Sequence, residues 1–248
     1  MRMTVERDED MDISRSDTGS NNCYDNAVKI PEPKPDTDAS RRYNCQPPQF
    51  SQVPLTATAL ASSPGSGSTW LRYLLQQATG IYTGSVYHDT ALADAGFYGE
   101  NITDSRVVVI KTHRERELQK YDRAILVIRD PYDAIVSEYN WRVSEHWHRF
   151  NSKWLDEFQG PLHVVFYEDM VDNLAMSLRN IIAFLGVPGT RIYCALRSPN
   201  GNFWRKPANI ASRYLFTRAQ RTVIDGYQEN VYEYVVQQQG RLRARMLE

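Results

Sequence analysis

The sequence contains few cysteines. Among its 248 residues only Cys23, Cys45 and Cys194 are cysteine, and no two of them form a Cys-x-x-Cys pair. Structural zinc sites and disulfide-rich small domains need more cysteines at closer spacing. The composition therefore excludes both classes and predicts no metal site, and it leaves room for a single Cys23–Cys45 bridge in an oxidising compartment.

Long apolar runs and an excess of charge of either sign are also absent. No segment reaches the roughly 18 apolar residues that span a bilayer, and the start of the chain has no apolar core typical of a signal peptide. The formal net charge is -1 at pH 7. We therefore expect no membrane segment or targeting signal in this chain. Because a globally basic surface is missing, we also expect no nucleic-acid partner.

The composition of the chain changes near residue 50. Residues 1–50 are rich in Asp, Ser, Asn and Pro and show no apolar periodicity. A segment of this kind buries too little apolar surface to fold, so we expect a disordered arm over 1–50. The hydrophobic content of 42% is sufficient for a core, so residues 51–248 are predicted to form one domain of catalytic size.

From residue 55 onward, short apolar runs of β type alternate with helical patterns. The predicted strands are 55–60, 107–110, 124–128 and 162–166, and the predicted helices are 68–79, 131–141, 173–185 and 217–239, the last one broken at Gly226. Strands and helices that alternate in this way are typical of a parallel sheet covered by helices. The sequence therefore predicts an α/β, P-loop-like three-layer fold.

A Gly/Ser-rich segment at 61–70 lies between the first predicted strand and the first predicted helix. Gly65 and Gly67 allow the backbone to approach a ligand, and the N–H groups at the helix N-terminus attract a phosphate. The hydroxyls of Ser66, Ser68 and Thr69 are further donors. A nucleoside-triphosphate P-loop would carry a lysine at the position of Ser68. The alternative interpretation is an ordinary strand-to-helix connection.

Polar residues follow two further strands. Lys111 and His113 come at the end of the second strand, where a lysine can neutralise developing negative charge and a histidine can accept a proton. Arg129 follows the third strand, and Ser137 lies almost two turns into the next helix. Because the carboxyl ends of parallel strands form the ligand crevice, these side chains could share one anion. The alternatives are a solvated strand end and local pairing of Arg129 with a neighbouring aspartate.

Taken together, these segments resemble the sulfotransferase superfamily. Residues 63–70 look like its 5'-phosphosulfate loop, and residues 129–131 with 137–140 look like its 3'-phosphate motif. Two further stretches, 166–170 and 201–206, are also similar to the superfamily. Within it, residues 70–72 and 78–85 look closest to the WSC-domain (WSCD-type) carbohydrate sulfotransferases, which are Golgi enzymes that act on glycans.

The resemblance implies a function and a set of site residues. It implies transfer of a sulfuryl group from 3'-phosphoadenosine 5'-phosphosulfate to a carbohydrate hydroxyl without a metal, and we expect His113 to act as general base and Lys111 to stabilise the leaving phosphate. It also implies residence in the Golgi. The implied donor-binding residues are Gly65, Ser66, Gly67, Ser68, Thr69, Trp70, Arg129, Ser137, Tyr167, Arg205 and Lys206.

The chain also departs from the pattern of the superfamily. Gly65 stands where cytosolic sulfotransferases carry a lysine, so Lys111 would have to supply the positive charge, with Arg72 as the reserve candidate. The interval 140–162 looks shorter than in the WSCD-type relatives. These departures keep two alternatives open: a non-catalytic nucleotide-binding relative, and a P-loop kinase or NTPase. The sequence specifies neither the acceptor sugar nor the oligomeric state.

Overall fold

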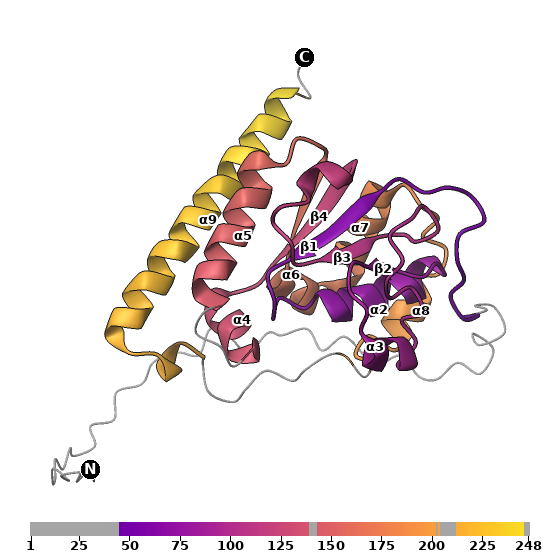
Figure 1. The fold of residues 1–248 in the computed structure, drawn as a ribbon, viewed down its shortest axis with the longest axis horizontal. Helices are drawn as coiled ribbons and strands as arrows, with labels where there is room; N and C mark the ends of the chain where they lie inside the picture. The colour runs from indigo at the N-terminus through magenta and orange to yellow at the C-terminus, as the bar shows by residue number, and fades with distance from the viewer. Residues whose placement is uncertain (1–44, 139–142, 202, 204–211, 246–248) are drawn as a thin grey trace, which may run out of the picture.

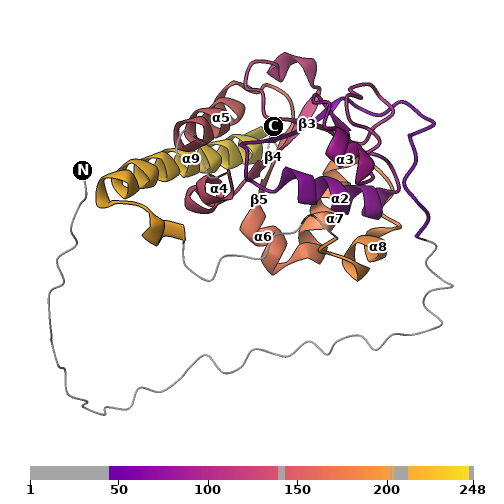
Figure 2. The ribbon, with the colours of Figure 1, turned by 60° about the horizontal axis from the view of Figure 1, so that its bottom comes forward.

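A computed structural model describes residues 45–138, 143–201, 203 and 212–245. A five-stranded sheet lies at the centre with strand order β2-β3-β1-β4-β5, and every neighbouring pair of strands is parallel. Helices cover both faces of the sheet (Figures 1 and 2). The predicted fold, a three-layer α/β structure with a central parallel sheet, is confirmed.

The strands are β1 (Thr58–Ser62), β2 (Gly84–Ser85), β3 (Ile110–Thr112), β4 (Arg123–Ile128) and β5 (Leu162–Phe166). The prediction was right for β5 and within one residue for β4. It was wrong by several residues for β1 and β3, both of which begin later than expected. Lys111 therefore lies within β3 instead of following it.

The helices are α2 (Ser68–Thr79), α3 (Thr90–Asp94), α4 (Pro131–Glu138), α5 (Val143–Glu157), α6 (Tyr167–Asp172), α7 (Leu174–Leu185), α8 (Ile192–Arg197) and α9 (Arg218–Arg245). Short 3-10 helices lie at η1 (Leu118–Lys120) and η2 (Ser212–Leu215). The prediction gave α2 correctly and α7 within one residue, and it missed α3, α5, α6 and α8. The break expected at Gly226 was wrong, since α9 is continuous there.

The two faces of the sheet bury different side chains, because successive strand residues point to opposite sides. In β1, Leu60 faces the cluster that contains α2 and α7, while Ala59 and Ala61 face the cluster that contains α5 and α9. The strand residues involved are fully buried, as expected for a central strand of a parallel sheet.

The long helix α9 lies alongside α5 on one face of the sheet (Figures 1 and 2). The contact has an apolar centre, with Trp147 and Trp154 of α5 and Val231 and Val235 of α9 in one buried cluster. This packing explains why α9 continues through Gly226: tertiary contacts outweigh the cost of about 1 kcal/mol of a glycine inside a helix. In the part of the chain described here, no helix combines the length and the apolar character needed to cross a membrane.

The described chain begins with residues that lie against the domain. A disulfide joins Cys45 to Cys194 of α8, so the bridge suggested between Cys23 and Cys45 is wrong. Gln49 pairs with Ile81, and the Phe50 ring lies 4.9 Å from the Tyr82 ring. The last residues of the predicted arm are thus part of the folded domain, and residues 1–44 lie outside the described residues.

We expect the Cys45–Cys194 bridge to make a large contribution to stability, because it closes a sequence separation of 149 residues. The variant Cys194→Ser should lower the free energy of unfolding by about 2–5 kcal/mol. Urea denaturation measures this value, and the wild type under reducing conditions should match the variant. The variant Cys23→Ser is the control, and a loss of stability in that variant alone would contradict the pairing.

Candidate functional site

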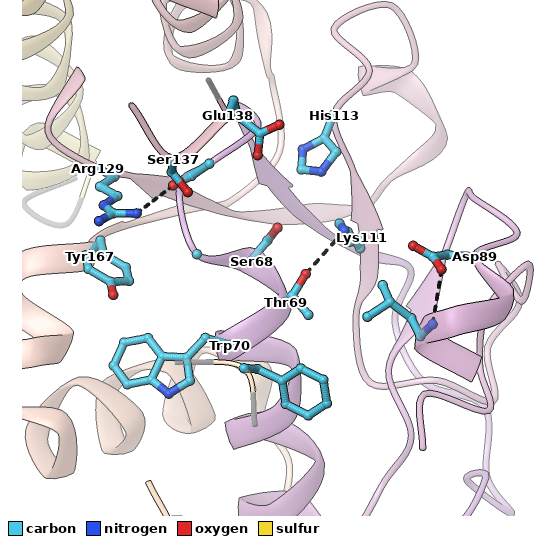
Figure 3. A pocket seen from close by; sticks show the side chains of 14 residues that line it. Ser68, Thr69, Trp70, Asp89, Lys111, His113, Arg129, Ser137, Glu138 and Tyr167 are labelled. Atoms are coloured by element: carbon cyan, nitrogen blue, oxygen red, sulfur yellow. Dashed lines mark hydrogen bonds between the residues drawn. The ribbon is translucent and has the colours of Figure 1, made fainter. Parts of the chain in front are cut away.

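A cavity of about 440 Å³ lies beyond the carboxyl ends of β1, β3 and β4 (Figure 3). We call it the strand-end cavity. Its lining residues are Gly65, Gly67, Ser68, Thr69, Trp70, Asp89, Leu92, Lys111, His113, Arg129, Ser137, Glu138, Tyr167 and Phe203. Ligands of open α/β sheets bind at this edge. Its volume lies within the roughly 300–1,000 Å³ range of small-molecule sites.

The loop between β1 and α2, residues 63–67, can carry only glycine at two positions. Gly65 has φ +77° and Gly67 has φ +89°, in the left-handed region that favours glycine. A Cβ at position 65 would lie 2.4 Å from the carbonyl oxygen of Ala134, and a Cβ at position 67 would lie 2.6 Å from the Tyr167 ring. A lysine at position 65 therefore does not fit in this chain.

The N-terminus of α2 faces the cavity. The N-cap residue is Gly67, which has no side chain, so no side-chain hydrogen bond from the N-cap occupies the first N–H groups of the helix. Ser68 and Thr69, in the first turn, line the cavity. Ser66 does not line it: its hydroxyl is buried and makes no hydrogen bond within the described part of the chain. The loop thus presents backbone and hydroxyl donors suited to an anion.

Lys111 reaches the loop from the neighbouring strand. Its Nζ donates to Thr69 Oγ1 across 3.4 Å (Figure 3). Burial lowers the pKa of the Lys111 ammonium, and the nearby charge of Arg72 lowers it further. An anion bound at the loop would oppose both effects, because it favours the charged form of the lysine.

His113 is held as a neutral imidazole with one defined tautomer. Its Nδ1 lies 2.6 Å from the carbonyl oxygen of Ser62. A carbonyl oxygen can only accept, so Nδ1 carries the proton and Nε2 has the free lone pair. Burial lowers the pKa of His113 to about 4, with a further lowering from the charge of Lys111. At neutral pH the ring is therefore able to accept a proton.

Arg129 borders the cavity at the end of β4. Its Nη1 donates to the carbonyl oxygen of Gly65 at 2.9 Å, and its guanidinium lies 4.4 Å from the centre of the Tyr167 ring. Its Nε is buried and makes no hydrogen bond among the described residues. Ser137 of α4 lines the same cavity (Figure 3). The alternative interpretation, pairing of Arg129 with a neighbouring aspartate, finds only a long contact, since Asp133 Oδ2 lies 3.8 Å from Nη2.

Two aromatic rings form another part of the wall. Trp70 and Tyr167 meet edge to face with their ring centroids 5.4 Å apart. The indole N–H of Trp70 donates to the carbonyl oxygen of Pro199 at 2.7 Å, which fixes the ring. Aromatic faces held in this way can stack on a planar base.

Arg72, the reserve candidate for the leaving phosphate, does not line the cavity. It is fully buried, and its Nη1 lies 2.5 Å from Glu100 Oε1. Its Nε donates to Thr83 Oγ1 at 3.0 Å. This prediction was wrong, because a guanidinium engaged in a buried ion pair is not available to a ligand. Arg205 and Lys206 lie outside the described residues.

The structure adds lining residues that the sequence analysis had not assigned to the site. They are Asp89, Leu92, Glu138 and Phe203. Asp89 also accepts a hydrogen bond from Leu92 N at 3.1 Å and so caps α3. An N-cap aspartate is a recognisable sequence signal, and Phe203 lies within the stretch 201–206 that resembles the superfamily. Within the described ranges, no cluster of three His, Cys, Asp or Glu is arranged to hold a metal ion.

We expect the unusual pKa of His113 to appear in the pH dependence of stability. Since the folded-state pKa of about 4 lies below the ordinary 6.5, the unfolded chain binds more protons between these values. The contribution of His113 to the free energy of unfolding is complete above pH 6.5 and is lost as the pH falls towards 4.

The difference in unfolding free energy between the wild type and the variant His113→Gln should therefore shrink on acidification, by up to about 3 kcal/mol. Urea denaturation from neutral to acid pH measures this difference. Because His146 and His163 are present in both proteins, their contributions cancel. A difference that does not change with pH would contradict the assigned environment of His113.

No family model matches the chain, but individual proteins are similar to it in sequence. WSCD family members from Aedes aegypti and Drosophila melanogaster are 38% and 37% identical to it over 206 residues. Each match covers 71% of this chain, and the chain spans 65% of the length of these curated relatives.

Two solved structures are also similar. Mouse sulfotransferase SULT7A1, complexed with PAP, is 20% identical with a TM-score of 0.48 and covers 69% of this chain and 82% of its own. The sulfotransferase domain of the Synechococcus PCC 7002 olefin synthase is 17% identical with a TM-score of 0.41 and covers 74% of this chain and 98% of its own. The identity to the insect proteins confirms the resemblance that the motifs predicted, and over 71% of its length the chain is similar to WSCD family members.

Proposed function

We propose that this chain transfers a sulfuryl group from 3'-phosphoadenosine 5'-phosphosulfate to a hydroxyl of a carbohydrate. The observation that carries the proposal is the meeting of three segments at one cavity. The glycine loop, the pair Lys111 and His113, and Arg129 all border it, although they come from three different strands. A donor with phosphate groups at two ends requires such an arrangement.

The lining residues suit the separate parts of this donor. The N-terminus of α2, with Ser68 and Thr69, would hold the 5'-phosphosulfate, because uncapped N–H groups and hydroxyls donate to an anion. Trp70 and Tyr167 would contact the adenine. The donor set fits the group, since the cavity offers cationic, hydroxyl and aromatic side chains together.

The 3'-phosphate would lie against Arg129 and Ser137, which border the cavity on the Tyr167 side (Figure 3). The buried Nε of Arg129 makes no hydrogen bond among the described residues and could donate to a phosphate oxygen. By the family resemblance, Arg205 and Lys206 would add charge here. Recognition of the second phosphate is what would separate this donor from ATP.

In the proposed reaction, the acceptor oxygen attacks the sulfur, and the bond between sulfur and the bridging oxygen of the 5'-phosphate breaks. Nε2 of His113 takes the proton of the acceptor hydroxyl, which is the role that a neutral imidazole can perform. Lys111 stabilises the negative charge on the departing phosphate. The products are the sulfated sugar and adenosine 3',5'-bisphosphate.

The carbohydrate acceptor and the Golgi compartment are proposed from the family resemblance. An oxidising lumen of the secretory pathway would be consistent with the Cys45–Cys194 bridge, because disulfides persist in such compartments. Gly65 is no obstacle to activity under this proposal. Lys111 reaches the loop from β3 and would supply the charge that a lysine at the equivalent of position 65 supplies in cytosolic sulfotransferases.

We expect the variant Arg129→Ala to lose selectivity for the second phosphate. Its affinity for adenosine 3',5'-bisphosphate should fall by about 10- to 100-fold, whereas its affinity for adenosine 5'-phosphate should change much less. Calorimetric titration with both nucleotides measures the ratio of the two affinities. A general distortion of the loop would weaken both nucleotides and would therefore cancel in this ratio. Equal weakening of both nucleotides, or tighter binding of ATP by the wild type, would count against the donor assignment.

The variant His113→Ala should lower turnover by about 10²–10⁴-fold while binding of adenosine 3',5'-bisphosphate stays nearly unchanged, because the imidazole would act on the acceptor. Transfer of labelled sulfate to a panel of glycans measures turnover. The variant His88→Ala is the matched control, since His88 is exposed and does not line the cavity. Near-normal turnover in His113→Ala would remove this residue from the mechanism.

A further inference from the structure

A second cavity, of about 460 Å³, lies next to the strand-end cavity. We call it the aromatic cavity. Its described lining residues are Pro47, Pro48, Tyr73, Gln76, Gln77, Tyr82, Ala95, Gly96, Phe97, Tyr98, Ser198, Gly201 and Phe203. It is as large as the strand-end cavity, and none of the proposed donor contacts uses it.

Aromatic rings supply much of its wall. Phe203 lies 5.6 Å from Tyr73 and 4.9 Å from Phe97 between ring centroids, and Tyr82 lies 5.5 Å from Tyr98. Tyr98 is 61% exposed, so part of its ring is open to a ligand from solvent. The cavity therefore offers both fixed and accessible aromatic surface.

The polar groups of this cavity carry no formal charge. Among its described lining residues there is no Asp, Glu, Lys or Arg, and the polar side chains are glutamine, tyrosine and serine. Arg72 lies 4.5 Å from the centre of the Phe97 ring, but it is fully buried and paired with Glu100. An uncharged ligand is thus favoured, because an ion would find no partner among these groups.

Gln77 is well suited to bind hydroxyl groups. Its amide both donates and accepts, and it lies on the partly exposed side of α2, whereas the amide oxygen of the neighbouring Gln76 already accepts from Thr83. A pyranose ring has apolar C–H faces that pack on aromatic rings and hydroxyls at its edge that bond to amides. The chemistry of the cavity matches this kind of ligand.

The position of the aromatic cavity relates it to the proposed reaction. Phe203 lines both cavities and forms a common wall. The segment around α3 borders both as well: Asp89 and Leu92 line the strand-end cavity, and residues 95–98 line the aromatic cavity. A glycan could therefore lie along α3 with one sugar near His113 and another in the aromatic cavity.

We propose that the aromatic cavity is an acceptor subsite that holds an uncharged sugar residue of the glycan. The proposal rests on the proposed function for its biological role, and it adds a second point of contact to the acceptor. The disulfide supports this subsite, since Cys45 precedes the Pro47–Pro48 wall and Cys194 lies in the helix that leads to Ser198.

Direct binding tests the subsite without the donor. Wild-type protein is titrated with the neutral disaccharides lactose, N-acetyllactosamine and chitobiose, and binding is followed by saturation-transfer NMR. We expect binding of at least one of them, weakened about three- to tenfold in Tyr98→Ala and in Gln77→Ala. Tyr214→Ala is the matched control, because Tyr214 is 76% exposed and lies outside both cavities.

A second readout uses the transfer reaction. In Tyr98→Ala the KM for a glycan acceptor should rise, while kcat and the affinity for adenosine 3',5'-bisphosphate stay unchanged. The subsite is overturned if no neutral disaccharide binds at millimolar concentration, or if Tyr98→Ala binds as well as the wild type.

Failure of the subsite and failure of the proposed function give different results. Transfer to glycans with an unchanged acceptor KM in Tyr98→Ala would overturn the subsite and leave the proposed function intact. If the wild-type protein does not bind adenosine 3',5'-bisphosphate and does not transfer sulfate, the proposed function is refuted. The NMR titration would still decide whether the aromatic cavity binds saccharide.

Discussion

The close packing of the loop between β1 and α2 is the constraint on which the rest of the site depends. Gly65 lies against the backbone of α4, and Gly67 lies against the Tyr167 ring, so neither position has room for a side chain. Arg129 bonds to the carbonyl oxygen of Gly65 and also lies over Tyr167. The loop, the end of β4 and the start of α6 are thereby held as one unit, and the N-terminus of α2 is aimed at the cavity.

Electrostatic balance within this unit follows from burial. Burial lowers the pKa of both Lys111 and His113, so an anion that enters the cavity would stabilise the charged form of either group. Arg72 and Glu100 form a buried ion pair that joins α2 to the segment before β3. Under the proposed function, the negative donor would therefore favour the charged form of Lys111, and shifted pKa values of this kind are a common property of functional sites.

The two cavities divide the proposed substrates by their chemistry. The strand-end cavity contains cations and hydroxyls suited to phosphate and sulfate, and the aromatic cavity contains rings and amides suited to sugar. Phe203 and the segment around α3 connect them. The disulfide supports the proposed acceptor side, because it joins two segments of the wall of the aromatic cavity.

The sequence by itself determined the parallel α/β architecture, the helix Ser68–Thr79 and the residues at the ends of three strands, because periodicity and strand-end polarity are local signals. Only the tertiary structure decided that Cys45 pairs with Cys194, that Arg72 forms a buried ion pair with Glu100, and that α9 runs unbroken through Gly226. Each of these depends on a partner distant in the chain. The packing that brings such partners together leaves no trace in the spacing of neighbouring residues.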